Sequence, residues 1–266
     1  MILIGEKINA TLPSIRSMIQ NRDAGAIAGL AKQQADAGSS YIDVNVGTGV
    51  GSQQEEVRSM EWAVEAIQSE VEVALSIDSS DPAVLEAGLK KGNGTPSMIN
   101  STKAERESLN AILPVASAHR SPLVALAMDE SGIPKTVQDR LRACEKIAEA
   151  CEQWGVLMEN VFFDPLVMPI ATDITQGLIT LETVTEIKKE FPEAKTVLGL
   201  SNVSYGLPAR SRLNAAFMQM AIYAGLDAAI VDPLNDDMMG EVRAAEVLMG
   251  KDRHCRRYTR AFRDRG

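Results

Sequence analysis

Short apolar runs alternate with longer amphipathic segments along most of this 266-residue chain. The runs, for example MILIGE at residues 1–6 and AAIVDP at residues 228–233, have the length of β-strands, and the segments between them space their apolar residues as helices do. Most runs are apolar on both faces, which is typical of parallel strands covered on both sides. The expected strands span residues 1–6, 41–47, 71–78, 97–102, 122–129, 160–166, 196–202 and 228–233.

This alternation predicts an α/β fold, namely a single-domain (β/α)8 barrel of the TIM type. Eight strand–helix units fill residues 1–250, so no gap is large enough for a second domain. A doubly wound open sheet is the structural alternative, but it normally carries a glycine-rich phosphate loop after its first strand, which MILIGEKINATLP lacks. The segment GTGVG, Gly47–Gly51, lacks the GxGxxG spacing and is interpreted as a flexible loop. The expected helices span residues 15–19 with 24–37, 55–69, 82–91, 105–118, 137–154, 178–190, 212–224 and 238–249.

The bulk properties exclude several classes of function. The formal charge of −9 makes nucleic acid a poor partner, and aromatic residues at 4% offer few stacking platforms. No segment resembles a signal peptide, and no apolar run reaches the roughly 20 residues needed to span a membrane, so a cytoplasmic protein with no membrane partner is expected. Cys144 and Cys151, spaced for one helix face, are expected to pack in the core. The basic tail, residues 251–266, is interpreted as a solvated end, with a docking patch for an acidic partner as the alternative.

Every expected strand ends in, or next to, a carboxylate or carboxamide side chain. In a barrel these ends converge on one mouth, where active sites lie. Helix capping or turn formation explains any one such residue, but explains the whole series poorly. The pattern therefore predicts a binding site for a polar ligand that has many N–H donors and carbonyl acceptors. The residues are Glu6 with Asn9, Asp43 with Asn45, Asp78, Asn100, Asp129, Asp164, Asn202 and Asp232.

The chemistry missing from these strand ends is also informative. The two histidines, His119 and His254, lie outside them, which argues against a histidine-based zinc hydrolase and a Ser–His–Asp enzyme. Lys103 is the one lysine placed for Schiff-base chemistry. A metal-dependent barrel lyase or hydrolase remains an alternative, with a hard divalent cation bound by Asp43, Asp78, Asp164 and Asp232.

The segments EKIN, DVNVG, SIDSS, MINST, DPL and GLSNVSYGLPARSRLN, in this order, resemble the pterin-binding methyltransferases. These are the methyltetrahydrofolate:corrinoid methyltransferases, which are related to the folate domain of cobalamin-dependent methionine synthase; dihydropteroate synthase is similar at a greater distance. The resemblance covers about residues 1–250. Its most specific part is GLSN with an arginine eight residues after the asparagine.

The resemblance implies that a pterin binds in the barrel mouth. It implies that Asp164 accepts the ring N–H and the exocyclic amine of the pterin, and that Asn100 and Asp78 contact the ring as well. One carboxylate is suited to this task because it can accept two adjacent donors. No metal site of the protein's own is expected from the resemblance.

The resemblance also implies a role in catalysis for two residues. Asn202 would lie near the methyl-bearing nitrogen and stabilise the charge that develops there, with Asp78 as the ionisable member of the same network. Asp78 or a water molecule would supply the proton. Arg210 matches the family's arginine, and its contact with pterin, glutamate tail or partner is left open. Supporting roles are implied for Glu6, Asn9, Asp43 and Asn45.

The expected reaction moves a methyl group between tetrahydrofolate and a Co(I) corrinoid. No DxHxxG motif is present, so the cobalamin or other corrinoid is expected free or on a separate corrinoid protein. The residues do not reveal the direction of transfer, the partner or the upstream methyl donor, and a homodimer is expected by analogy. Two alternatives remain besides the metal-dependent barrel: a condensing pterin enzyme of the dihydropteroate synthase type, and a folate-binding protein without turnover.

Overall fold

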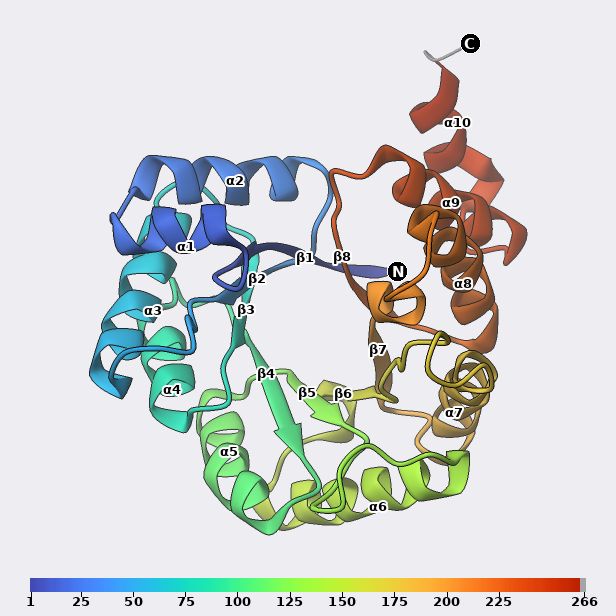
Figure 1. Cartoon of the computed structure of the whole chain (residues 1–266), viewed down its shortest axis with the longest axis horizontal. Helices are drawn as coiled ribbons and strands as arrows, with labels where there is room; N and C mark the ends of the chain where they lie inside the picture. Colours follow the sequence, from blue (N-terminus) through green and yellow to red (C-terminus); the bar gives the residue numbers. More distant parts are fainter. Residues whose placement is uncertain (264–266) are drawn as a thin grey trace.

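The structure, a computed structural model, describes residues 1–263, and these form a closed barrel of eight parallel strands (Figure 1). Each strand pairs with its sequence neighbours, and β1 closes the barrel against β8. This confirms the predicted TIM barrel. The strands are β1 (Ile2–Asn9), β2 (Tyr41–Asn45), β3 (Ala74–Asp78), β4 (Met98–Lys103), β5 (Leu123–Leu126), β6 (Val161–Asp164), β7 (Lys195–Gly199) and β8 (Ala228–Val231).

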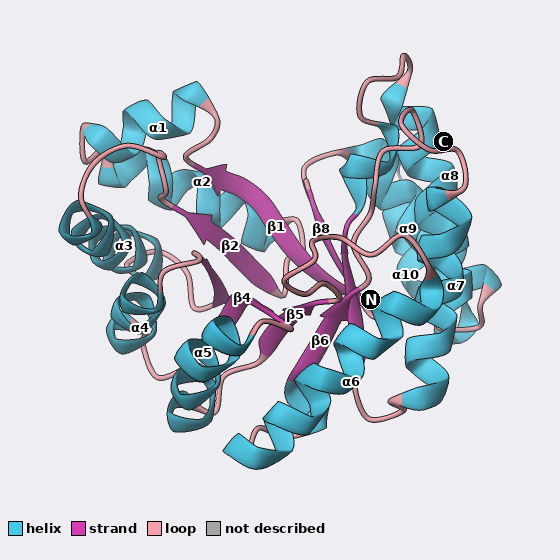
Figure 2. Cartoon of the chain, turned by 60° about the horizontal axis from the view of Figure 1, so that its bottom comes forward, coloured by secondary structure: helices cyan, strands magenta, loops and turns pink. Residues whose placement is uncertain are grey.

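The helices surround the barrel (Figure 2). Five of the ten described helices begin at a residue whose side chain caps the first turn. Ser52 and Glu55 form a capping box before α3, and Asp81 caps α4 ahead of Pro82. The helices are α1 (Pro13–Gln20), α2 (Ala24–Asp36), α3 (Gln53–Gln68), α4 (Pro82–Lys91), α5 (Arg106–His119), α6 (Val137–Trp154), α7 (Gln176–Glu190), α8 (Arg210–Ala224), α9 (Asp236–Leu248) and α10 (Arg256–Phe262), with short 3-10 turns η1 (Met158–Asn160), η2 (Leu200–Ser204) and η3 (Arg253–Cys255).

Five of the expected strands end two or three residues earlier than predicted, and the first continues to Asn9; the strands that are shortened most are β5 and β7. The strand expected at 122–129 ends at Leu126, and Asp129 lies in a tight turn where it accepts the Ser131 N–H. The strand expected at 196–202 ends at Gly199, and the 3-10 turn that follows it carries Asn202. Asp and Ser side chains compete for backbone N–H groups in this way, so they favour turns over continued pairing.

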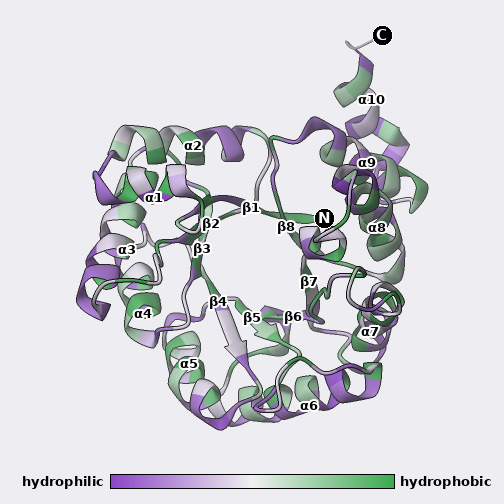
Figure 3. Ribbon diagram, in the orientation of Figure 1, coloured by the Kyte–Doolittle hydropathy of each residue, from purple (hydrophilic) through white to green (hydrophobic). Residues whose placement is uncertain are grey.

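Apolar residues fill the barrel and the layer between the strands and the helices, and in Figure 3 hydrophobic residues follow several strands while the helices carry both kinds. Cys144 and Cys151 are buried on α6, so their predicted packing role is confirmed, and Met238 and Met239 are buried on α9. The cluster inside the barrel consists of Ile4, Met98, Val124, Phe162, Val197 and Ala228.

The described residues of the basic tail contact α9. Its helix α10 follows α9, where Arg257 forms an ion pair with Glu246 at 3.2 Å and Asp252 accepts the Tyr258 N–H (Figure 1). Residues 264–266 of the predicted tail lie outside the described part of the chain. Within residues 1–263, no helix combines the length and the apolar character that crossing a membrane requires.

Candidate functional site

The strand alternation builds a polar layer directly above the apolar interior. Side chains two residues apart on a strand face the same side, so the residue two beyond each interior residue points into the barrel mouth. Ile4 is followed in this way by Glu6, and Phe162 by Asp164. The layer is therefore a direct product of the sequence pattern, and its polar members are Glu6, Asp43, Asn45, Asp78, Asn100 and Asp164.

Neighbouring members on β2, β3 and β4 are bonded to one another. The Asp43 Oδ1 atom accepts hydrogen bonds from Ser76 Oγ at 2.7 Å and from Asn100 Nδ2 at 3.2 Å. Asn45 Nδ2 donates to Asp78 Oδ2 at 2.9 Å. Ser76 was missed in the sequence analysis, although its place two residues before Asp78 puts it on the same inward face. The predicted residues of these strands thus form one side of the mouth.

The carboxyl groups of this side have raised pKa values. Burial raises the pKa of Asp43 to about 7, aided by the charge of Asp78 and opposed by hydrogen bonds from Ser76 and Asn100. Burial also raises the pKa of Asp78. Burial and then the charge of Asp232 raise the pKa of Glu6 to about 7. The group is therefore less negative at pH 7 than its formula suggests, and it can give or take a proton there.

Asp164 stands apart from that network at the end of β6. Its Oδ1 atom accepts the Leu166 N–H at 2.8 Å, and its Oδ2 atom makes no hydrogen bond with the described residues. Burial raises the pKa of Asp164 to about 6, while the Leu166 N–H and the Arg140 guanidinium lower it. The carboxylate is thus buried, and one of its oxygens is bonded to the backbone. Its other oxygen is available to accept hydrogen bonds from the N–H donors of a ligand.

Asn202 lies in η2 above β7, where its side chain is exposed and makes no hydrogen bond within residues 1–263. Arg210, at the start of α8, holds that turn together. Its Nη2 atom donates to the Ser201 carbonyl at 2.8 Å, and its Nε atom donates to Ser204 Oγ at 3.0 Å. The guanidinium also lies over the Tyr205 ring. Arg210 therefore braces the turn that presents Asn202.

The remaining polar strand ends have local partners. Asn9 Oδ1 accepts the Thr11 N–H at 2.9 Å, which makes it a turn former at the rim. Asp129 pairs with Lys146 at 2.9 Å on the outside of the barrel, away from the mouth.

Both lysines near the mouth are already paired. Lys7 bonds to Asp232 at 2.9 Å, and Lys103 bonds to Glu105 at 2.7 Å. Among the described residues, no three or more His, Cys, Asp or Glu side chains are arranged to hold a metal ion.

Exposed apolar side chains surround the mouth on six different loops that follow strands. Such large exposed apolar residues at one end of a molecule are typical of contact surfaces. The most exposed of them, Ile174 and Val50, have exposed fractions of 88% and 77%. The set comprises Leu12, Val50, Ile133, Ile174, Tyr205 and Leu234.

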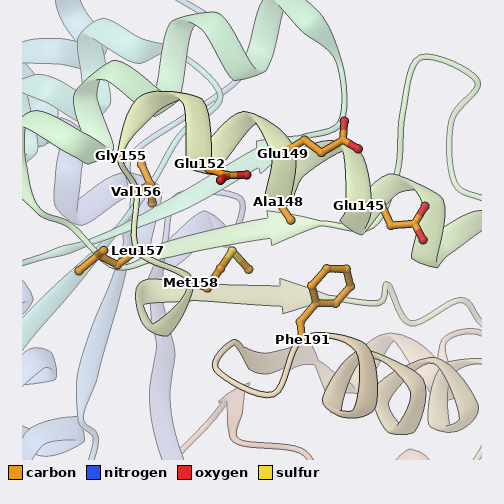
Figure 4. Close-up of a pocket in the computed structure, with 9 residues that line it drawn as sticks. All are labelled: Glu145, Ala148, Glu149, Glu152, Gly155, Val156, Leu157, Met158 and Phe191. Atoms are coloured by element: carbon orange, nitrogen blue, oxygen red, sulfur yellow. The ribbon is translucent and has the colours of Figure 1, made fainter.

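A pocket of about 510 Å³ lies at the opposite end of the barrel (Figure 4). It is formed by the end of α6, the connection from α6 to β6 and Phe191 at the end of α7, with Glu152 and Leu157 in its lining. These segments precede their strands or follow their helices, and this face of a TIM barrel serves stability rather than catalysis. The pocket is therefore separate from the polar mouth.

Solved structures share the fold with this chain. A dihydropteroate synthase from Clostridium difficile, solved in the presence of pteroic acid, aligns with a TM-score of 0.74 at 21% identity, covering 93% of this chain and 96% of that one. A dihydropteroate synthase from Yersinia pestis with a pterine–sulfa conjugate aligns with a TM-score of 0.72 at 20% identity, covering 94% and 93%. At these identities the likeness concerns the fold alone.

Sequence relatives are more specific. The methylcorrinoid:tetrahydrofolate methyltransferase of Eubacterium limosum is 35% identical over 268 residues, covering 99% of this chain and 96% of the relative. The methionine synthase of Mycobacterium tuberculosis is 32% identical over 244 residues, covering 87% of this chain but only 20% of that much longer protein. The profile of the family described as pterin binding enzyme matches residues 5–232. The chain belongs to this family of pterin-binding enzymes.

Proposed function

We propose that the protein is a methyltransferase that moves a methyl group between N5 of tetrahydrofolate and the cobalt of a corrinoid, with the pterin bound in the barrel mouth. The observation that carries the proposal is the full-length relation, at 35% identity, to a methylcorrinoid:tetrahydrofolate methyltransferase. The name of that relative describes transfer from the methylcorrinoid to tetrahydrofolate, and the proposal includes this direction.

In this proposal the pterin is recognised mainly by Asp164. The free Oδ2 atom of a buried, ionised carboxylate accepts the N–H and amine donors of a pyrimidinone edge, which water would otherwise have to satisfy. Asn100 and Asp78 contact the ring from the opposite side of the mouth. The bonded network around Asp43 fixes the direction in which these two side chains point.

The methyl transfer itself needs a proton acceptor and a polar contact at N5. The N5 lone pair forms the new bond to carbon, the cobalt–carbon bond leaves its electron pair on cobalt, and N5 loses its proton. A carboxyl group with a pKa of about 7 suits that transfer at neutral pH, and Asp43 provides one, while burial raises the pKa of its neighbour Asp78 as well. Asn202, free of partners on its braced turn, hydrogen-bonds to N5 as its charge changes.

The corrinoid has to reach N5 from outside, because this chain has no motif that would hold it. Bond exchange requires cobalt and N5 to approach a single methyl group, so a corrinoid or its carrier protein has to cover the mouth. The exposed apolar side chains on the surrounding loops suit such a contact with a flat macrocycle.

The alternatives fit the mouth less well. A condensing pterin enzyme has to stabilise a pyrophosphate leaving group with cations, yet Lys7 and Lys103 are both paired with carboxylates. A metal-dependent lyase requires several converging ligands, whereas Asp232 is bonded to Lys7 and Asp164 lies apart from Asp43.

The decisive experiment is anaerobic absorbance spectroscopy of cobalamin. Methylcobalamin with tetrahydrofolate, and cob(I)alamin with methyltetrahydrofolate, are each incubated with the protein. Conversion that requires the protein and is unaffected by a chelator supports the proposal, and the faster direction tests its orientation. Folate binding without conversion, even after addition of corrinoid proteins, would leave a binding protein as the answer.

The proposal includes a homodimer. The outer face of α7 and α8 exposes Leu178, Met220 and Tyr223, and the exposed fraction of Tyr223 is 78%. Apolar side chains of this size are commonly covered by a second subunit. Light scattering is expected to give twice the chain mass of 28.7 kDa, and a value equal to that mass would overturn the dimer.

A further inference from the structure

Arg140 is a fully buried cation that lies behind the proposed pterin site. It sits on α6 with an exposed fraction of 0%, and no ion pair joins it to a carboxylate within residues 1–263. Its three hydrogen bonds go to neutral acceptors: the Pro134 carbonyl at 3.1 Å, Thr180 Oγ1 at 3.2 Å and Gln176 Oε1 at 2.8 Å. A buried charge without an adjacent counter-charge is costly, so its position calls for a reason.

A continuous series of contacts connects this guanidinium with Asp164. Thr180 Oγ1, which accepts the Arg140 hydrogen bond, has two carbonyl oxygens within reach of its own proton, that of Gln176 at 2.9 Å and that of Leu166 at 3.3 Å. The N–H of the same Leu166 donates to Asp164 Oδ1 at 2.8 Å. Leu166 has a φ of 67°, a left-handed conformation that a leucine adopts only when its surroundings hold it there. Arg140 thus supports the turn that orients the carboxylate.

We infer that Arg140 is a positioning residue for pterin recognition: its charge keeps Asp164 an anion, and its hydrogen bonds fix the turn that aims this anion at the mouth. The inference rests on the proposed function, because it assigns Asp164 to the pterin. It explains why a cation is buried at this place and why its bonds go to neutral atoms. The counter-charge is Asp164 itself, kept at a distance so that its second oxygen stays available to the ligand.

No other cation of the described residues competes for this role. From α6, Cys144 also faces Asp164, but burial raises the pKa of its thiol, so it is uncharged. The strand β5 contributes no ionisable side chain, and Lys195 at the start of β7 bonds to the Glu159 carbonyl at the opposite end of the barrel. From the turn before α7, Asp173 accepts the Gln176 amide and is exposed. Burial raises the pKa of Asp164 to about 6, and the Leu166 N–H and Arg140 lower it.

The test is the pH dependence of tetrahydrofolate binding, measured anaerobically by calorimetry from pH 5.5 to 9. Wild-type affinity is expected to fall as the pH drops below about 6, when Asp164 takes up a proton. In Arg140→Met the positive charge near Asp164 is lost, so the affinity for tetrahydrofolate is expected to fall at a pH about one to two units higher than in the wild type. Binding would then be about two- to tenfold weaker at pH 7 and close to wild type at pH 9. The ligand's own titration is common to all variants and cancels in the ratio of affinities.

Three further variants separate charge from packing. Arg142→Met, on an exposed residue of the same helix, is expected to bind as wild type at every pH. Arg140→Lys keeps the charge. The pH midpoint of its fall in tetrahydrofolate affinity is expected to equal that of the wild type, even if binding is weaker at every pH. Gln176→Glu places a carboxylate against Arg140 without removing it, and is expected to raise the midpoint as Arg140→Met does. This last variant decides the matter if Arg140→Met does not fold.

An unchanged midpoint in both Arg140→Met and Gln176→Glu overturns the inference. Equal weakening at every pH overturns it as well, because it indicates lost packing rather than lost charge. Both results leave the proposed function intact, provided that the wild type binds tetrahydrofolate. A wild-type protein that binds no tetrahydrofolate at any pH overturns the proposed function and the inference together.

Discussion

The two halves of the barrel mouth contain the same residue types but hold them differently. In the β1–β4 half, polar side chains of β2, β3 and β4 bond to one another: Asp43 accepts from Ser76 and Asn100, and Asn45 donates to Asp78. On β5–β8 the polar side chains do not bond to each other. Asp164 is held by a backbone N–H, Asp232 by a lysine, and Asn202 by no side-chain bond at all.

This difference separates two tasks that a pterin enzyme has to combine. Neighbouring buried carboxyl groups influence each other's protonation through their charge, as Asp78 does for Asp43, which suits proton transfer. Isolated groups with a free oxygen or amide suit recognition and contact at one defined atom. If the comparison is right, substitutions in the β5–β8 half remove single contacts, whereas those in the β1–β4 half change pH behaviour.

The largest expected effect follows Asp164→Asn. This change replaces a charged acceptor of two donors and adds an amide that repels them, so affinity for tetrahydrofolate is expected to fall about 100-fold or more. Calorimetry at pH 7.5 measures it. Asp129→Asn is the matched control, because it changes the same residue type after the neighbouring strand, where the partner is Lys146. A loss of less than tenfold in Asp164→Asn would remove Asp164 from the recognition role.

The next effect concerns the turn above β7. Asn202→Ala removes the contact proposed at N5, and turnover with methylcobalamin and tetrahydrofolate is expected to fall about 100- to 1000-fold. Affinity for tetrahydrofolate should change far less, because the contact strengthens only as charge moves in the transition state. Asn110→Ala, on the exposed side of α5, is the control. Equal losses of affinity and turnover would place Asn202 among the binding residues instead.

The raised pKa of Asp43 in the β1–β4 half is tested through the pH dependence of the protein's stability against unfolding. A carboxyl group whose pKa is about 7 in the folded protein and near 4 when unfolded binds more protons when folded. Stability therefore falls as pH rises from about 4 to about 7, by roughly 1.4 kcal/mol per pH unit. Asp43→Asn has no such group, so its unfolding temperature relative to wild type should be about 4–8 °C higher at pH 8 than at pH 5.

Thermal unfolding followed by circular dichroism measures this difference at both pH values. Asp129→Asn is the control, because hydrogen bonds from Ser131 and Lys146 lower the pKa of Asp129 to about 2, so this carboxylate is ionised in the folded and the unfolded protein at both pH values. That variant should not gain stability as pH rises. If the difference in unfolding temperature between Asp43→Asn and wild type is the same at the two pH values, the pKa of Asp43 is not raised in the folded protein.

The comparison also indicates how far the sequence alone could lead. Strand spacing and inward alternation place Glu6, Asp78 and Asp164 correctly, because a barrel leaves each inward position only one direction. The same rule cannot distinguish Asp129, whose strand ends earlier and whose side chain turns outward to Lys146. Bonds across the barrel, such as Ser76 to Asp43, depend on register between strands, which one sequence does not state.

Arg140 illustrates the same limit on a helix. Helix periodicity places Arg140 on the buried face with Cys144, four residues later, and Arg142 on another face, but the partners of Arg140 on α7 come only from the three-dimensional packing. Arg210 was assigned from the GLSN motif without a contact, and the structure supplies one in the η2 turn. The motif thus selected a candidate residue, while the three-dimensional structure was needed to say what it touches.

The smallest expected effect concerns that Arg210 contact. Arg210→Met removes the bonds to Ser201 and Ser204 that brace the η2 turn, each contributing about 1 kcal/mol. The turn still forms but presents Asn202 less consistently, so turnover should fall about three- to tenfold with tetrahydrofolate affinity unchanged. Arg212, two residues further along α8, is exposed, and Arg212→Met should match wild type in both turnover and tetrahydrofolate affinity. The opposite result, lost affinity with turnover per bound folate intact, would mean that Arg210 contacts the folate directly. The β5–β8 half would then recognise its ligand with a cation as well as with Asp164.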